Sequence, residues 1–361
     1  MKLTAPDYIL GIKPYVPGKP IEELEREYGI TDSIKLASNE NPLGPSPMAV
    51  KAIQEAMGNL NRYPDDSGYA LVNKISEKLD VRPDNIVIGN GSDEIIGMIV
   101  RAFLQPGDEA IVPHPTFLMY EIMIQCAGAI SLRVPLKSLS IDLESIKEKL
   151  TPRVRLILLC SPNNPTGSAI AKDDFETFIK DIPPDVVVVL DEAYMEFVRD
   201  KNCVSGITYL DPGRPLIVLR SFSKAYGLAG LRIGYGIMPE EISNLLNRVR
   251  QPFNTNLLAQ AGAVAALDDD YFLQKTINLV HKEIDFLYGA LSEIGLKYFE
   301  TQANFLLVDV GKNADDVYEK MLRQGVIVRS MTSYGYPSYI RVNVGLASEN
   351  RRFIEALKKV I

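Results

Sequence analysis

Short apolar segments recur through the middle of the chain and alternate with amphipathic ones. Five of them are rich in Val, Ile and Leu and end in polar turns; they span residues 84–90, 108–114, 155–162, 185–194 and 215–222. Continuous apolar runs of this kind are typical of strands buried on both faces of a parallel sheet. Residues 92–104 and 172–182 repeat apolar side chains at helical spacing instead. The alternation predicts an α/β fold whose large domain has a mostly parallel central sheet sandwiched by helices.

The two ends of the chain depart from this pattern. Pro14, Pro17 and Pro20 disfavour a packed helix, so residues 1–30 are predicted to form an extended surface arm that belongs to a smaller domain. A long helical pattern covers residues 270–295, and shorter strand and helix segments follow it. The sequence therefore predicts a large domain over 31–268 and a smaller α+β C-terminal domain over 269–361.

Composition and charge narrow the classes of function. The net charge of -7 over 361 residues lacks the basic excess that nucleic-acid binding requires. No apolar run is long enough for a membrane span, and the first residues lack a signal-peptide core. Cys126, Cys160 and Cys203 show no C-x-x-C pairing, which predicts neither a disulfide framework nor a zinc site. We expect a cytoplasmic protein that binds no metal, no nucleic acid and no membrane.

Polar motifs follow several of the predicted strands. They read GNGSDE (89–94), HPTF (114–117), SPNNPTG (161–167), DEAY (191–194) and SFSK (221–224). In doubly wound sheets, ligands bind beyond the carboxyl ends of the strands, so these motifs mark the candidate site. SPNNPTG, taken alone, also fits an ordinary turn.

The GNGSDE motif is a candidate phosphate site. It opens a helix with Ser92 as the expected N-cap, and its glycines allow an anion to approach the free backbone N–H groups closely. The same residues also fit a simple capped turn. The motif lacks the G-K-[ST] of a Walker A loop and the last glycine of G-x-G-x-x-G, so it does not support a nucleotide-binding loop.

One lysine stands out near the end of the last strand. Lys224 follows Ser221 and Ser223, and Arg232 lies eight residues further on. Asp191 ends another buried strand, where a carboxylate needs a cation unless it merely caps a helix. A lysine beside such a carboxylate and a phosphate site suits pyridoxal phosphate, which needs a Schiff-base lysine and an acidic partner for its ring nitrogen. The two serines and Arg232 would bind its phosphate.

The ordered motifs N-P-T-G, D-E-A-Y, S-F-S-K and G-L-R-I-G resemble the aspartate aminotransferase superfamily, fold type I, over essentially the whole chain. Within it, LASNENPLGPSP (36–47), RYPD (62–65), GNGSDE, PTFLMY, VIVRSM and YIRVNVG are similar to the histidinol-phosphate aminotransferases. The resemblance implies pyridoxal-phosphate-dependent transfer of the amino group of L-histidinol phosphate to 2-oxoglutarate. The products would be imidazole acetol phosphate and L-glutamate, in histidine biosynthesis.

The resemblance also implies a role for each matching residue. The catalytic set would be Lys224, which holds the cofactor covalently and moves the proton, Asp191, which pairs with the ring nitrogen, and Tyr194. Asn164 would join Tyr194 at the phenolic oxygen of the cofactor. The residues implied at its phosphate are Gly91, Ser92, Asp93, Ser221, Ser223 and Arg232.

Further positions complete the implied site. Phe117 would stack on the cofactor; many relatives have tyrosine there, so this chain lacks that hydroxyl. Tyr63 would reach the phosphate of a neighbouring subunit, which implies a homodimer with shared active sites; a Tyr-Pro turn is the alternative. The residues implied at the substrate are Arg341, Arg329, Tyr15 and Asn39, of which the last three also fit surface packing.

Other functions remain open at this stage. Threonine-phosphate decarboxylase is closely similar, and an aminotransferase with broad or aromatic preference shares the same motifs. A pyridoxal-phosphate-sensing regulator would carry an attached helix-turn-helix domain, for which the sequence gives no sign. A serine or cysteine hydrolase is disfavoured because only His114 and His281 are available as bases, and neither lies in a triad-like setting.

Overall fold

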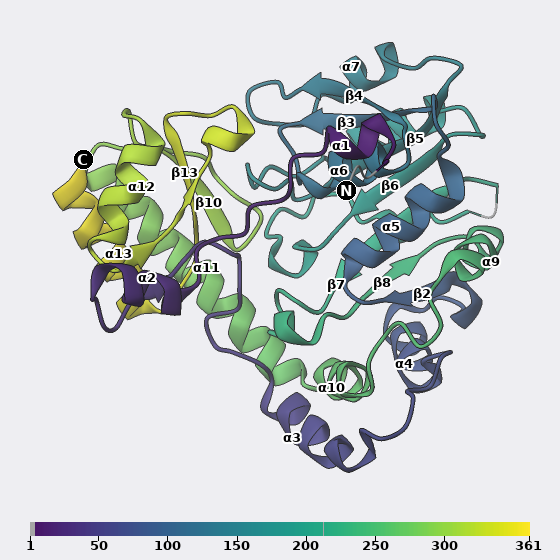
Figure 1. Ribbon diagram of the computed structural model, residues 1–361, viewed down its shortest axis with the longest axis horizontal. Helices are drawn as coiled ribbons and strands as arrows, with labels where there is room; N and C mark the ends of the chain where they lie inside the picture. The colour runs from purple at the N-terminus through teal and green to yellow at the C-terminus, as the bar shows by residue number, and fades with distance from the viewer. Residues whose placement is uncertain (1–3, 212) are drawn as a thin grey trace.

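The computed structural model describes residues 4–211 and 213–361. It contains a sheet of seven strands, a sheet of four and a pair of short strands. The larger sheet and its helices form one part of the molecule, and the four-stranded sheet with the C-terminal helices forms a second part beside it (Figure 1).

The seven-stranded sheet is mostly parallel, as predicted. Its strands, in spatial order, are β2 (Ile86–Gly89), β8 (Gly234–Ile237), β7 (Leu216–Ser221), β6 (Val187–Asp191), β5 (Val154–Cys160), β3 (Glu109–His114) and β4 (Ile130–Pro135). Only β8 runs antiparallel to its neighbours. Sequence reasoning did not identify β4 and β8: β4 is an edge strand in which only one of six residues is buried, and β8 reads GYGI, with two glycines in four residues.

Helices cover both faces of this sheet, which confirms the predicted sandwich. Along β6, Val187 and Val189 pack into one apolar core, and Val188 and Leu190 pack into another. The first core is closed by α5 (Ser92–Phe103), α6 (Met119–Cys126) and α9 (Glu240–Val249). The second is closed by α3 (Pro47–Ala56), α4 (Tyr69–Leu79), α7 (Leu143–Glu148), α8 (Lys172–Asp181) and α10 (Leu257–Asp268).

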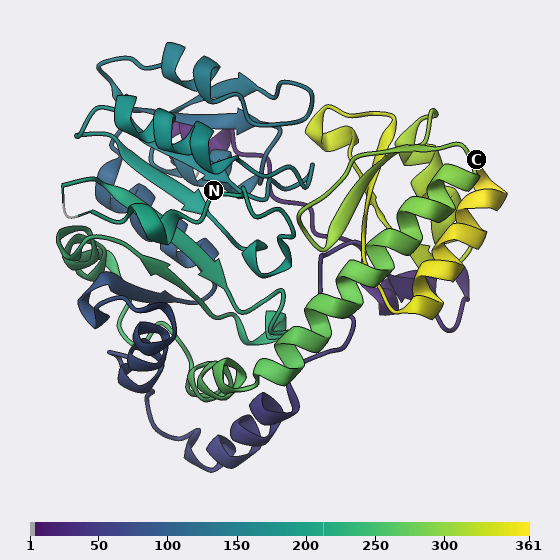
Figure 2. The same cartoon turned by 180° about the vertical axis from the view of Figure 1, so that it is seen from behind.

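The smaller sheet is antiparallel. It comprises β12 (Arg329–Ser330), β13 (Tyr339–Asn343), β10 (Phe305–Asp309) and β9 (Lys297–Tyr298). The helices beside it are α11 (Asp270–Glu293), α12 (Ala314–Leu322) and α13 (Ala347–Val360), and Figure 2 shows α11 running from α10 to this sheet. Arg329 and Arg341 are directly paired across β12 and β13. The strand register therefore places both predicted substrate arginines together.

The N-terminal arm differs from the prediction. It contains two short helices, α1 (Asp7–Leu10) and α2 (Ile21–Tyr28), joined by residues without regular structure that pass from the large sheet to the small one (Figure 1). Pro20 is the N-cap of α2, where a missing N–H costs nothing. Leu24 is fully buried against Leu322 and Ile327, so this part of the arm is packed. Residues 1–3 of the predicted arm lie outside the described residues.

Short elements complete the chain. Strand β1 (Ile34–Lys35) pairs in parallel with β11 (Val326–Ile327). The single-turn helices are η1 (Met57–Asn59), η2 (Pro83–Asn85), η3 (Met195–Phe197), η4 (Gly206–Tyr209), η5 (Ala229–Leu231) and η6 (Thr332–Tyr334). In the part of the chain that the structure describes, no helix combines the length and the apolar character needed to cross a bilayer.

Candidate active site

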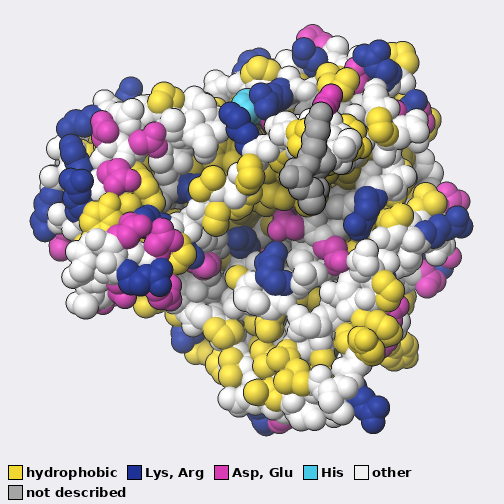
Figure 3. Space-filling model, in the orientation of Figure 1, with side chains coloured by type: hydrophobic (Ala, Val, Ile, Leu, Met, Phe, Trp, Pro, Cys, Tyr) yellow, Lys and Arg dark blue, Asp and Glu magenta, His cyan; other side chains and the backbone are white. Residues whose placement is uncertain are grey.

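A cavity of about 270 Å³ lies between the two parts of the molecule, at the carboxyl ends of β5, β6 and β7. Figure 3 shows the surface hollowed there, with basic and acidic side chains on its floor. Most of the residues predicted from the sequence line it: Tyr15, Asn39, Ser92, Asp93, Phe117, Asn164, Asp191, Tyr194, Ser221, Ser223, Lys224, Arg232, Arg329 and Arg341. The fold thus brings together motifs that are far apart in the chain.

Lys224 extends into this cavity from the turn after β7. Its Nζ atom lies 3.3 Å from the carbonyl oxygen of Ser38, to which it donates, and 5.7 Å from the centre of the Tyr194 ring. Burial, and then the positive charge of Arg341, lower the pKa of Lys224 from 10.5 to about 8. A useful fraction of this amine is therefore uncharged near neutral pH.

Asp191 ends β6 and is only 4% exposed. Its carboxylate accepts hydrogen bonds from the Tyr120 hydroxyl at 2.6 Å and from the Ala193 N–H at 3.1 Å. Burial raises the pKa of Asp191 to about 6, although the Tyr120 hydrogen bond opposes this. Among the ion pairs of the described residues, none includes Asp191, so the cation expected from the sequence is not supplied by a protein side chain there.

Tyr120 and Glu40 were missed by sequence reasoning. Tyr120 is fully buried, lies on α6 and packs edge-on against Phe117, with ring centres 5.5 Å apart. Phe117 precedes the start of α6, so no helical spacing links the two residues and the sequence carries no local signal for Tyr120. Glu40 lines the cavity from the SNENP segment and pairs with Lys35 at 3.1 Å; an acidic residue in a polar loop gives no comparable signal.

The segment before α5 forms a cradle for an anion. The helix begins at Ser92 and Gly91 is its N-cap, so the predicted N-cap was wrong by one residue. Gly91 has a φ of 81°, and a Cβ there would lie 2.7 Å from Arg232 Nη2. Arg232 in turn donates to Ser223 Oγ at 3.4 Å and to Asp93 Oδ2 at 3.3 Å. Helix N–H groups, a hydroxyl and a guanidinium therefore converge, as a phosphate site requires.

A second polar cluster faces the small sheet. Arg341 is buried and donates to Asn164 Oδ1 and to the Ala37 carbonyl, each at 2.6 Å. The Tyr194 hydroxyl accepts from the amides of Asn39, at 3.0 Å, and Asn164, at 3.4 Å. Arg341 Nε and Asn39 Oδ1 are buried and have no hydrogen-bond partner among the described residues. Because unpaired buried polar atoms are costly, these two atoms suit a polar ligand in the cavity.

Arg329 and Tyr15, which belongs to the arm, line the cavity together. The Arg329 guanidinium lies 5.9 Å from the centre of the Tyr15 ring, and it donates to the carbonyl oxygen of Val16 at 2.8 Å. The arm therefore lies directly against the second predicted anion-binding arginine.

Gly91 borders the cavity without lining it, and Tyr63 and the two histidines lie outside it. Tyr63 is 82% exposed and stacks on Phe253, with ring centres 4.6 Å apart. His114 faces Glu121 at 3.1 Å, and His281 in α11 contacts the Phe197 carbonyl at 2.8 Å. Within the described residues, no group of His, Cys, Asp and Glu side chains is arranged to hold a metal ion.

Comparison with known proteins identifies the family. The model for aminotransferase class I and II matches residues 31–357. The chain belongs to this family. It is 47% identical to histidinol-phosphate aminotransferase of Moorella thermoacetica, covering 98% of this chain and 92% of the relative, and 49% identical to that of Desulfotalea psychrophila, covering 99% and 95%.

A solved aminotransferase structure supports the same conclusion. The histidinol-phosphate aminotransferase of Sinorhizobium meliloti, in complex with pyridoxal 5'-phosphate, superposes with a TM-score of 0.91 at 27% identity, covering 98% of this chain and 96% of that one. The predicted fold type I architecture and the predicted aminotransferase resemblance are thereby confirmed.

Proposed function

We propose that the protein is a pyridoxal-phosphate-dependent histidinol-phosphate aminotransferase. It transfers the amino group of L-histidinol phosphate to 2-oxoglutarate and so forms imidazole acetol phosphate and L-glutamate, a step of histidine biosynthesis. The observation that carries this conclusion is the identity of 47–49% to enzymes of that name over nearly the whole chain. The alternatives from the sequence, threonine-phosphate decarboxylase and an aminotransferase with broad or aromatic preference, are not favoured by these relatives.

The site residues fit pyridoxal phosphate. Asp191 is a buried carboxylate without an ion-pair partner among the described residues, which suits a protonated ring nitrogen. The glycine turn at Gly91, together with Ser223 and Arg232, suits the phosphate dianion, and a side chain on Gly91 would fill that space. When bound, the cofactor supplies an electron sink for negative charge at the substrate Cα.

The protein residues hold and move the protons. Lys224 is the attachment point, and as a free amine with a pKa of about 8 it takes the proton from the substrate Cα near neutral pH. Asp191 keeps a proton on the ring nitrogen through its negative charge. Tyr194 and Asn164 hydrogen-bond the phenolic oxygen, and Phe117 packs against the ring.

The two arginines explain how one pocket serves two substrates. Arg341 and Arg329 are neighbours across β12 and β13 and line the same cavity. Guanidinium groups bind phosphate and carboxylate with the same paired N–H geometry. They bind the phosphate of histidinol phosphate in the first half-reaction and a carboxylate of 2-oxoglutarate in the second, with Tyr15 and Asn39 closing the pocket.

The proposal includes a homodimer with shared active sites. Tyr63 does not line the cavity of its own chain and is 82% exposed, which supports a role in a partner's site. Residues 31–268 act as the cofactor-binding domain, and the arm with residues 269–361 acts as the smaller domain.

A donor panel tests the proposed reaction. Purified protein with pyridoxal phosphate and 2-oxoglutarate is given L-histidinol phosphate, L-phenylalanine or L-threonine phosphate, and glutamate and carbon dioxide are measured. We expect glutamate with histidinol phosphate and at least a tenfold lower kcat/KM with phenylalanine, because phenylalanine lacks the phosphate that both arginines bind. Carbon dioxide from threonine phosphate without any glutamate would contradict the proposal.

A further inference from the structure

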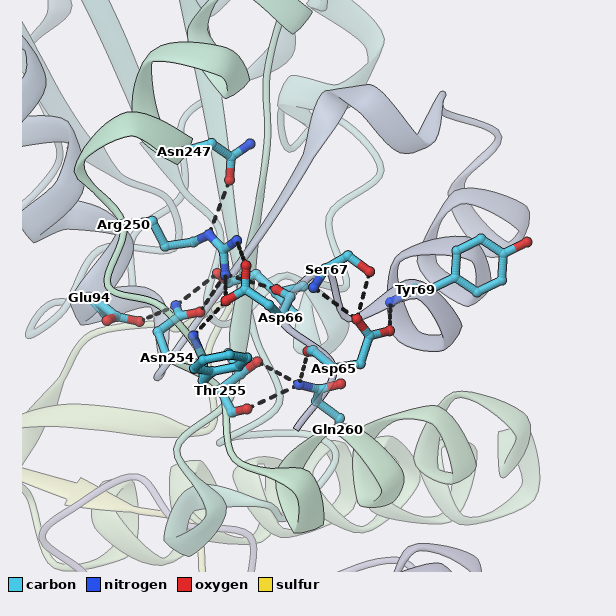
Figure 4. Close-up of polar contacts among 12 residues, drawn as sticks. Asp65, Asp66, Ser67, Tyr69, Glu94, Asn247, Arg250, Asn254, Thr255 and Gln260 are labelled. Atoms are coloured by element: carbon cyan, nitrogen blue, oxygen red, sulfur yellow. Dashed lines mark hydrogen bonds and ion pairs between the residues drawn. The ribbon is translucent and has the colours of Figure 1, made fainter. Parts of the chain in front are cut away.

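A dense polar network joins two loops that are distant in the sequence (Figure 4). Asp66 accepts two hydrogen bonds from Arg250, with distances of 2.8 Å to Nη2 and 3.4 Å to Nη1, and a third from the Phe253 N–H at 2.5 Å. Arg250 Nη1 also donates to the backbone oxygen of Asp66 at 2.9 Å. This guanidinium is mostly buried, with 13% of its side chain exposed. The loops at residues 62–69 and 250–256 are thus joined through the hydrogen bonds and ion pair of Asp66.

Asn254 carries the network toward the cavity. Its Oδ1 atom accepts from Arg250 Nη1 at 2.9 Å, which fixes the direction of the amide. Its Nδ2 atom then donates to Glu94 Oε2 at 2.6 Å and to the carbonyl oxygen of Ile88, at the end of β2, at 3.3 Å. Figure 4 shows Arg250 between Asp66 on one side and Asn254 with Glu94 on the other.

Glu94 completes the connection to the phosphate cradle. Its Oε2 atom also accepts the backbone N–H of Asn90 at 2.6 Å. Asn90 precedes Gly91, whose backbone lies against the guanidinium of Arg232. One carboxylate oxygen therefore holds the glycine turn on one side and receives the Asn254 amide on the other. Displacing Glu94 would release the turn against which Arg232 packs.

We infer that Glu94, Asn254 and Arg250 are positioning residues for the phosphate cradle, acting through the backbone N–H of Asn90. None of them lines the cavity. They hold the turn at Gly91 in the shape that brings the N–H groups of α5 and the Arg232 guanidinium to one anion. This inference rests on the proposed use of pyridoxal phosphate, and it adds three residues to which the sequence motifs gave no role.

The test compares two ligands that differ only in the phosphate. Dissociation constants for pyridoxal phosphate and for pyridoxal are measured by absorbance in the parent protein and in Glu94→Ala and Asn254→Ala. We expect each variant to bind pyridoxal phosphate about tenfold more weakly, as for the loss of one charge-assisted hydrogen bond. Pyridoxal affinity should stay within about twofold, because the cradle has no phosphate to hold.

Two further variants sharpen the result. Glu94→Gln keeps an oxygen that accepts from Asn90 and Asn254, so it should retain pyridoxal phosphate affinity within about threefold. Asn247→Ala removes an exposed acceptor on the far side of Arg250, 3.1 Å from Nε, and should change neither ligand's affinity. Equal weakening for both ligands in Glu94→Ala and Asn254→Ala would overturn the inference, as would unchanged affinity for both. If the variants lose affinity for pyridoxal phosphate alone, but the parent protein does not turn over histidinol phosphate, the inference holds and the proposed reaction is refuted.

Discussion

At the scale of single residues, burial governs the protonation of Lys224. Its pKa of about 8 means that the folded protein without cofactor carries this charge at a cost of about 3 kcal/mol at pH 7. The cost applies fully below pH 8. As the pH rises from 8 to 10.5, the unfolded chain binds a proton that the folded chain has already lost, so the cost disappears.

Replacing Lys224 should therefore stabilise the cofactor-free protein. We expect Lys224→Met to raise the free energy of unfolding by about 3 kcal/mol at pH 7 and by roughly half of that at pH 9.5. Urea unfolding at the two pH values measures both differences, and the same variant should have no transaminase activity. An equal gain at both pH values would show that the lysine is not buried in its charged form.

Against the effect of burial, the hydrogen bond from Tyr120 lowers the pKa of Asp191. This hydrogen bond favours the carboxylate, so Tyr120→Phe should raise the pKa of Asp191 further above its ordinary value. Activity should then fall about tenfold at pH 6 but less than threefold at pH 8.5. The pH profile of kcat/KM checks this, with Tyr336→Phe, outside the cavity, as the control. A uniform loss at all pH values would contradict it.

Local spacing predicted only part of the site. Lys224, Ser223 and Arg232 lie close in sequence, and their chemical types identify them as a group. Tyr120 is different, because its role depends on packing between α6 and β6, which no local pattern records. Asp191 was expected to need a cation, and its protein partners are only a hydroxyl and one N–H, which leaves that place for a ligand.

At the scale of elements, a buried ion pair joins the carboxyl ends of β6 and β7. Arg220 lies 2.7 Å from Glu192 and 3.5 Å from Glu196, and all three side chains are at most 10% exposed. Glu192 directly follows Asp191, and Arg220 directly precedes Ser221. The pair thus holds the two strands that bring a carboxylate and a hydroxyl into the cavity.

Breaking this pair from one side should be costly. Arg220→Met leaves two carboxylates buried without a cation, so we expect unfolding free energy to fall by about 3–5 kcal/mol. Glu192→Gln added to Arg220→Met should recover part of the loss. Lys51→Met, which removes an exposed pair with Glu55, should change stability by less than about 0.5 kcal/mol. Denaturant unfolding compares the three, and a loss for Arg220→Met no larger than the control would refute the role.

Element prediction succeeded where burial is uniform and failed where it is not. The five apolar runs all became strands, because burial on both faces leaves an unbroken apolar signal. The edge strand β4 and the glycine-containing β8 lack that signal. In the arm, Pro20 was expected to prevent a helix, but proline is tolerated at a helix start. Leu24 then stabilises α2 by packing against Leu322 and Ile327, which are too far away in the sequence for a local pattern to reveal the contact.

At the scale of the whole molecule, one face is marked by exposed apolar side chains. Figure 3 shows them over α3 at the bottom of the view, and the exposed residues of this region are Met48, Val50, Met57 and Leu60. Tyr63 and Phe253 add an exposed aromatic pair. Such a surface suits the proposed partner subunit.

Subunit mixing tests whether sites are shared. Lys224→Ala and Tyr63→Ala homodimers should each have little activity, because one lacks the amine and the other lacks the tyrosine at every site. After equal mixing and reassociation, random pairing restores one intact site in each mixed dimer, or roughly a quarter of all sites. Activity assays of the mixture measure this, and sedimentation confirms the dimer. No recovery after proven exchange would place Tyr63 outside the partner's site.

Helix α11 has a mechanical consequence for the substrate arginines. Its 24 residues form a rod about 36 Å long, and its base is fixed where Asp269 accepts a hydrogen bond from Ser46 at 2.5 Å. Leu287 and Leu291, toward its other end, pack into the core beneath the small sheet. A tilt of α11 by about 3° about its N-terminal end therefore moves its C-terminal end by about 2 Å. The distance between Lys224 and the two arginines proposed to bind the substrate thus depends partly on the angle of α11 at its opposite end.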